Sequence, residues 1–201
     1  MRKITQTIYN FDELEEETKK KLIEARKEEE AQFYCEWGLL EDMQEEAKRL
    51  LKKYFKGQAV FEKVYYSLSY SQGDGAMIIF NVPIEAINEI APKEAKLNKK
   101  DLNIIKESYT DKVNIKHNNG FYYHERSFTI ENDFYLYQAD ELSEDGQKKL
   151  EALLNWLKAY IITMNEELTE AGYKFIEAEP EEAYIIEQLQ ENEYFKNGEI
   201  Y

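Results

Sequence analysis

The residues best suited to chemistry lie in two short segments of the chain, and the first is a glycine-rich turn. There Asp74 stands between Gly73 and Gly75. A carboxylate on such a turn can bind a metal ion or act as a general base, and the neighbouring backbone N–H groups can hold an anion. Ser71 and Gln72 would add polar contacts to a ligand bound there. An Asp between glycines is also ordinary turn chemistry, so a purely structural role is the alternative.

The second segment carries the two histidines of the chain, His117 and His124. Asn119-Gly120 between them is typical of a two-residue hairpin turn. With that turn, His117 would face Tyr122, and His124 would lie on the same face as a diagonal neighbour. A three-residue loop would instead put the imidazoles on opposite faces. A shared ligand site that includes Tyr123 is one interpretation, and a structural or surface role is the other.

Nucleophilic catalysis finds little support in the sequence. A Ser-His-Asp set can be assembled from Ser71, His124 and Asp74, but the serine lacks the Gly-x-Ser-x-Gly pattern of a nucleophile elbow. No third metal ligand matches the histidines in position. We therefore assign no catalytic or metal-binding residue and expect a protein that is not an enzyme and has no cofactor.

Strands are expected on both sides of each segment, since β-branched and aromatic residues are frequent there. Residues 60–69 and 77–82 predict one hairpin, and residues 112–117 and 121–137 predict a second. Both hairpins should belong to one antiparallel sheet.

Several helices should pack against this sheet, and two of them have clear sequence signals. Ser143 can cap a long helix near residues 143–170, where apolar residues keep helical spacing. A helix over residues 31–55 should turn one apolar stripe toward the core, made of Phe33, Trp37, Leu40, Met43, Ala47, Leu50, Leu51 and Tyr54. The fold class is thus α+β, an antiparallel sheet of two central hairpins packed against several helices, in a single acidic domain over residues 1–201.

Charge is the main compositional signal. The chain has 41 acidic and 26 basic residues, a formal net charge of −15. Residues 1–50 carry −5 and residues 165–201 carry −9, which leaves the middle at −1. Because phosphate contacts need clustered Lys and Arg, direct nucleic-acid binding is not expected. The charge suits docking on a basic protein surface, including mimicry of nucleic-acid charge, while simple solubilisation is the alternative.

Tyrosine is abundant, with 16 in the chain. Several fall on the predicted strands and their tips: Tyr65, Tyr66, Tyr70, Tyr122, Tyr123, Tyr135 and Tyr137. Tyrosine is enriched at protein interfaces, so a protein partner is favoured over base stacking. A homodimer built on exposed aromatic strands is a further possibility.

Cysteine usage and hydropathy indicate the compartment. Cys35 is the single cysteine, which excludes an internal disulfide. The first residues show no apolar signal core, and no run approaches the ~20 apolar residues of a membrane helix. We expect a cytoplasmic protein without a membrane partner.

Several segments together resemble an uncharacterised family of small bacteriophage and prophage proteins. They are Phe11–Leu14, the Tyr70–Ala76 segment YSQGDGA, the set His117, Gly120, Tyr123 and His124, and the closing Tyr194–Tyr201. Some members of that family are labelled automatically as an antitoxin of a toxin-antitoxin stability system. The resemblance implies a mobile-element origin and a common fold, and no established activity.

These features favour a phage- or prophage-derived protein that inhibits or modulates a host protein through an acidic, tyrosine-rich surface. The partner would be a basic host protein such as a nucleic-acid-binding defence protein or a toxin. An anti-CRISPR-like inhibitor and an antitoxin are the two concrete versions. The competing hypothesis is a small enzyme or a ligand- or metal-binding protein centred on the Gly73-Asp74-Gly75 turn with His117 and His124, which requires the two hairpin tips to converge.

Overall fold

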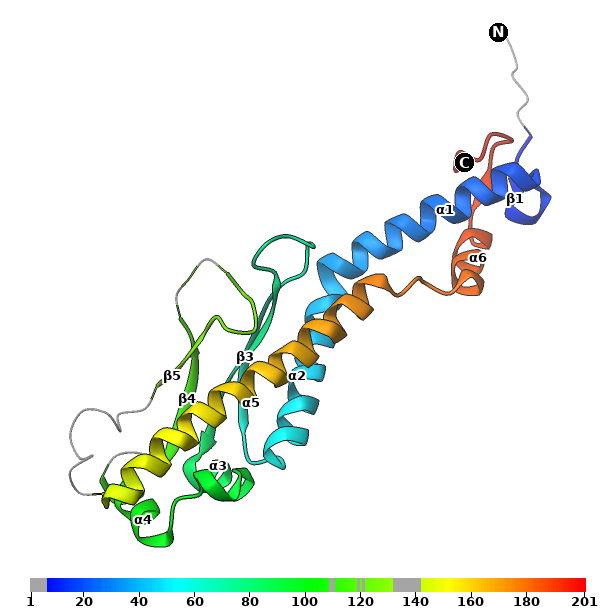
Figure 1. Ribbon diagram of the computed structural model, residues 1–201. Coiled ribbons are helices and arrows are strands. Elements are labelled where there is room, and N and C mark those ends of the chain that lie inside the picture. The colour runs from blue at the N-terminus through cyan, green and yellow to red at the C-terminus, as the bar shows by residue number, and fades with distance from the viewer. Residues whose placement is uncertain (1–6, 109–110, 119, 121, 132–141) are drawn as a thin grey trace. The chain divides into compact units, whose positions relative to one another are not determined.

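The structure is a computed structural model that describes residues 7–108, 111–118, 120, 122–131 and 142–201 (Figure 1). It divides into two compact units. Unit 1 consists of residues 1–40 and 175–201, and unit 2 consists of residues 41–174. The single-domain expectation stays a prediction.

Unit 2 is built on a four-stranded antiparallel sheet in the order β2-β3-β4-β5. The strands are β2 (Val60–Ser67), β3 (Gly75–Pro83), β4 (Lys112–His117) and β5 (Phe128–Glu131). β2 and β3 form the first predicted hairpin, and β4 and β5 form the second. The α+β class is therefore confirmed. β3 is buried from Gly75 to Phe80, as expected of an apolar strand in the interior of the unit.

Helices α2 (Leu39–Phe55) and α5 (Glu144–Glu177) pack against this sheet (Figure 1). The rings of Phe55 and Phe80 lie 5.2 Å apart, which joins α2 to β3. The Tyr160 hydroxyl donates to the Tyr54 carbonyl oxygen at 3.0 Å, which joins α5 to α2. Shorter helices follow β3: α3 (Ile84–Ile90), η3 (Lys93–Ala95) and α4 (Lys99–Ser108).

The long helix α5 begins where its sequence predicts. The Ser143 hydroxyl accepts a hydrogen bond from the Gly146 N–H at 2.9 Å, the geometry of an N-cap. Buried Asp101 lies beneath this cap and accepts from both the hydroxyl and the N–H of Ser143. The α5 N-terminus is therefore held by two side chains, and the helix continues past the predicted end at 170.

The apolar stripe predicted along residues 33–54 is buried only in its second half. Met43 and the later members are buried, whereas Phe33, Trp37 and Leu40 are 62%, 71% and 47% exposed. Helical spacing decides which side chains share a face, but another element must cover that face to bury it. The core-facing prediction is therefore wrong for these three residues.

The second hairpin also departs from its prediction. His117 pairs with Phe128, so the connecting loop spans residues 118–127 and is not a two-residue Asn119-Gly120 turn. The Asn118 N–H donates to the Ser127 carbonyl oxygen at 3.1 Å, and the Ser127 N–H donates to that of His124 at 2.9 Å. These bonds close the loop later in the sequence, so the expected strand from residue 121 begins only at Phe128. The last part of that predicted strand, residues 132–137 with Tyr135 and Tyr137, lies outside the described residues.

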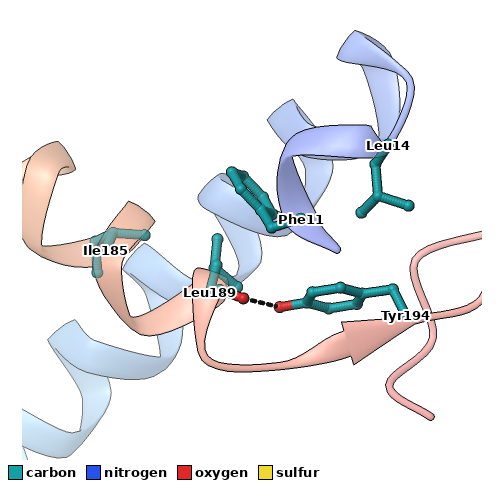
Figure 2. Close-up of a cluster of buried hydrophobic side chains, with 5 residues drawn as sticks. All are labelled: Phe11, Leu14, Ile185, Leu189 and Tyr194. Atoms are coloured by element: carbon teal, nitrogen blue, oxygen red, sulfur yellow. Dashed lines mark hydrogen bonds between the residues drawn. The ribbon is translucent and has the colours of Figure 1, made fainter. Parts of the chain in front are cut away.

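Unit 1 is assembled from both ends of the chain. β1 (Tyr9–Asn10) pairs antiparallel with β6 (Glu193–Tyr194). Its helices are η1 (Phe11–Glu13), α1 (Glu16–Phe33), the π-helix η2 (Tyr34–Gly38) and α6 (Glu182–Gln190). Figure 2 shows the buried core of this unit: Phe11, Leu14, Ile185, Leu189 and Tyr194. Leu22 and Ile23 of α1 pack against it. The buried Tyr194 hydroxyl donates to the Leu189 carbonyl oxygen at 2.8 Å, so its polar atom is satisfied.

Within the described residues, no helix has the length and apolar character needed to cross a membrane.

Candidate functional site

The Asp74 carboxylate is held by hydrogen bonds from its own loop. The backbone N–H groups of Ser69 and Ser71 donate to Oδ2 at 2.6 and 2.7 Å. The hydroxyls of Ser67, Ser69 and Ser71 lie 2.7 to 3.4 Å from its oxygens. The Ser71 N–H and the Ser67 hydroxyl are the main reasons why the pKa of Asp74 lies well below its usual value. Asp74 is therefore an ionised structural centre of this turn, with its lone pairs already engaged.

The glycines beside Asp74 allow a second loop to approach. A Cβ on Gly73 would lie 2.2 Å from the Tyr122 ring, and one on Gly75 would lie 2.8 Å from Glu125 Oε1 and 2.9 Å from His124 Cα. Both glycines also have positive φ, +91° and +152°. Residues 68–74 and the described residues of the 118–127 loop, called the loop pair below, therefore meet. The convergence of the two hairpin tips that the competing hypothesis requires is present.

Helix α5 supports the loop pair from beneath with two polar side chains. Fully buried Asn165 accepts from the Ile78 N–H at 3.1 Å and donates to the Glu125 carbonyl oxygen at 3.1 Å. Thr169, one turn later, accepts from the Ala76 N–H at 2.8 Å and lies 2.9 Å from Glu125 Oε1. These two N–H groups lie along β3 before the stretch paired with β4, which begins at Phe80. The side chains of α5 take the place of the missing strand partner.

Three rings pack together at the base of the second loop. Tyr65 and Tyr123 are stacked with centroids 5.4 Å apart, and His117 lies 5.2 and 5.3 Å from them. The His117 Nε2 donates to the Tyr122 carbonyl oxygen at 3.3 Å. Lys63 Nζ lies 4.4 Å from the Tyr65 centroid and so supplies a cation to this cluster.

The two histidines have different surroundings. His117 belongs to the ring cluster, while the His124 ring lies 6.4 Å from that of Tyr122 and its Nδ1 accepts from the Arg126 N–H at 3.1 Å. The predicted geometry, in which they are diagonal neighbours on one hairpin face, is wrong because the hairpin register differs.

The structure thus brings the predicted residues into one loop pair, but their side chains make separate contacts and do not converge on one ligand site. Ser71 donates to Asp74, Gln72 is exposed, and the Tyr123 and His117 rings contact each other at a tilt. Among the described residues, no group of three His, Cys, Asp or Glu side chains is arranged to hold a metal ion. The loop pair also presents aromatic side chains to solvent: Tyr70 and Tyr122 are 66% and 56% exposed.

Sequence reasoning missed Asn165, Thr169 and Glu125. The sequence does carry a signal for Asn165 and Thr169. They are polar residues, four positions apart, on the same helix face as the buried Ile161, Met164 and Leu168. A polar residue on an apolar helix face needs a partner, which points to a buried hydrogen-bond network. Glu125 carries no such local signal.

The acidic charge is concentrated in unit 1. Its 67 residues hold 18 acidic and 8 basic side chains, net −10, while unit 2 holds 23 and 18, net −5. The tyrosines of the loop pair belong to unit 2. The acidic and the tyrosine-rich surfaces are therefore carried by different units.

Comparison with known proteins gives one match. The family described as "Domain of unknown function (DUF8835)" matches residues 39–183. This segment covers unit 2 and leaves most of unit 1 outside. No curated protein and no solved structure matches the chain.

Proposed function

We propose that this chain, which belongs to the DUF8835 family, is an acidic binding protein of phage or prophage origin that inhibits or modulates a host protein. The observation that supports this most is the net charge of −10 on unit 1. Such a field attracts a positively charged partner and accelerates association. The partner is a basic protein of the bacterial cytoplasm, and the activity is binding without catalysis.

The cations of unit 1 add to this proposal because they are largely paired within the unit. Arg26 contacts Glu29 and Glu30, Lys27 contacts Glu182, and further pairs are Lys19–Glu16, Lys21–Glu17 and Lys196–Glu15. Each of these five cations is matched by an acid of the same unit, and the unit still carries more acids than bases. The surplus can then be matched by Lys and Arg of a partner.

Two classes of partner suit this charge. A nucleic-acid-binding defence protein presents a basic groove, and an acidic inhibitor of the anti-CRISPR type would compete for that groove. A toxin that acts on nucleic acid presents a similar surface to an antitoxin. Both versions share one recognition chemistry, carboxylates against Lys and Arg, and both compete with nucleic acid.

Affinity capture from host lysate with the full chain tests the proposal. It should recover a basic protein whose binding weakens steeply with salt and which nucleic acid displaces. Neutralising three exposed acids of unit 1, Glu24→Gln, Glu28→Gln and Glu187→Gln, should reduce capture. The matched control removes the same charge from unit 2 through Glu45→Gln, Glu94→Gln and Glu151→Gln. Recovery of no partner, or of one indifferent to salt, contradicts the proposal.

The second candidate function is a small-ligand or metal site at the loop pair, favoured by the meeting of the two loops. It must use groups that the loops do not already bond, which leaves His124 Nε2 and the exposed side chain of Gln72. Elemental analysis and Zn²⁺ titration followed by histidine NMR test it. A stoichiometric bound ion that is lost in the His124→Ala variant would establish this function. Histidine NMR signals that do not shift on addition of Zn²⁺ would eliminate a metal site.

A further inference from the structure

An exposed apolar stripe lies on the helix that leaves unit 1. Phe33, Trp37 and Leu40, called the helical stripe below, follow each other at spacings of four and three residues. They are 62%, 71% and 47% exposed. This spacing places large apolar side chains on one helix face, and all three belong to unit 1. Contiguous exposed apolar surface of this kind marks an interaction site.

The helix is also irregular at the stripe. Residues Tyr34–Gly38 form a π-helical turn between α1 and α2. A Cβ on Gly38 would lie 2.6 Å from the Tyr34 ring, so the glycine lets that ring lie against the helix backbone. π-helical turns cost stability and occur frequently at functional sites. The irregular turn therefore coincides with the apolar stripe.

The charge around the stripe is negative. Residues 24–36 hold five acidic residues and two basic ones. Both cations are engaged, since Arg26 pairs with Glu29 and Glu30, and Lys27 pairs with Glu182. Gln32 donates to Glu36 at 3.0 Å, which leaves the negative charge of Glu36 in place. Of these acids, Glu29, Glu30 and Glu36 are three or four residues from Phe33, so they flank the stripe and give it acidic edges.

These edges select the occupant. A second copy would set carboxylates against carboxylates, in a chain of net charge −15, and like charges across an interface are unfavourable. A helix with one apolar face and with Lys or Arg along its margins would pack against the apolar side chains of the stripe and pair with the acids at its edges. Helix recognition of this kind uses anchors at the same three-to-four spacing.

We propose that the helical stripe binds an amphipathic, basic helix of the partner protein. This inference rests on the proposed function and specifies how the acidic unit engages its partner. Trp37, the most exposed of the three anchors, is the central contact, since tryptophan is frequent among residues that dominate binding energy. The acidic edges fix orientation and attract the basic helix, while the three apolar side chains supply the contact.

Synthetic peptides test the proposal with the full chain. The probe is a fluorescent helical peptide of leucine and lysine with one apolar face, compared with a scrambled peptide of the same composition and with a leucine–glutamate peptide of the same pattern. Anisotropy should report binding of the first peptide alone. Phe33→Ser with Trp37→Ser should weaken it about tenfold or more. Val60→Thr, at a residue that is 54% exposed in unit 2, should leave affinity unchanged.

A charge exchange gives an independent readout. Glu29→Lys with Glu36→Lys should transfer preference from the lysine peptide to the glutamate peptide, and circular dichroism checks that each variant is folded. Equal binding by the wild type and the stripe variant, or equal binding of the scrambled peptide, overturns the proposal. A dimer in sedimentation that the stripe variant dissociates also overturns it, because a second copy is then the occupant.

The peptide assay tests the helical stripe and the lysate capture tests the proposed function, so either proposal can fail without the other. If capture of a basic partner is salt-sensitive but unaffected by Phe33→Ser with Trp37→Ser, the proposed function stands and the helical stripe is not its docking surface. If the peptide binds at the stripe but no basic protein is captured, the stripe binds helices and the proposed function fails.

Discussion

At the scale of single residues, the glycine turn is explained by what surrounds it. Asp74 organises the serines of its loop, and Gly73 gives room to the Tyr122 ring. Neither role requires a ligand. The YSQGDGA segment therefore has a structural reason for its acid and for its glycines, and both reasons can be measured.

Asp74→Asn should destabilise the protein at neutral pH, because the amide NH₂ would face donors that now bond a carboxylate. The pKa of Asp74 is lowered in the folded protein from an ordinary value of 3.8. Its contribution is therefore fully present above about 3.8 and is lost as pH falls toward the lowered value. Urea unfolding of both proteins over this range should show a difference that shrinks with acid. Asp145→Asn, at an exposed residue with one pair to Lys149, should show a much smaller difference.

Gly73→Ala should be more destabilising than Gly57→Ala. Both glycines have positive φ, +91° and +77°, so both changes cost about 1–2 kcal/mol of backbone strain. A Cβ at Gly57 meets nothing closer than 4.0 Å, whereas one at Gly73 meets the Tyr122 ring. The excess, about 1–3 kcal/mol, measures the close approach of the two loops. Equal free energies of unfolding would show that the loops do not meet.

At the scale of elements, helix α5 replaces part of a strand. β4 pairs with β3 only from Phe80 to Pro83, and Asn165 and Thr169 satisfy the β3 amides before that point. The same side chains reach the Glu125 carbonyl and carboxylate, so α5 fixes both the open sheet edge and the second loop. Helix α5 therefore anchors β3 and Glu125 of the second loop with the same two side chains.

Asn165→Leu should lower the free energy of unfolding, because Asn165 bridges β3 and the second loop. The change introduces an apolar side chain with the same number of heavy atoms and leaves the Ile78 N–H and the Glu125 carbonyl without partners, which costs about 1–3 kcal/mol for each group. Hydrogen exchange of the Ile78 amide should accelerate. Asn155→Leu, at an exposed position of the same helix, controls for the change in helix propensity. Unchanged exchange at Ile78 would contradict the bridging role.

At the scale of the whole molecule, the chain holds two cores. Unit 1 unites residues near both termini around Phe11 and Tyr194, and unit 2 surrounds β3. Most of the net charge lies in unit 1, while the segment that matches the DUF8835 family covers unit 2. The proposed partner-binding surfaces of charge and helical stripe thus lie mainly outside the family segment.

Phe11→Ala should open unit 1 while leaving unit 2 folded. Phe11 is 3% exposed, and truncation of a buried phenylalanine costs about 3–5 kcal/mol. Hydrogen exchange followed by mass spectrometry should show faster exchange in residues 182–194, with β3 still protected. Equal loss of protection in β3 would instead indicate one cooperative domain, as the sequence predicts.

The sequence by itself determined the features encoded between near neighbours. Helical spacing and the Ser143 cap predicted α5, and β-branched and aromatic residues on both sides of turn glycines predicted the first hairpin. Composition determined the net charge. The tertiary structure alone decided the late closure of the second hairpin, the exposure of Phe33 and Trp37, and the convergence of the loop pair on α5. These depend on contacts such as Asn165 with Ile78, 87 residues apart. Local pattern specifies which face of an element is apolar, but only the packing of distant segments specifies what covers it.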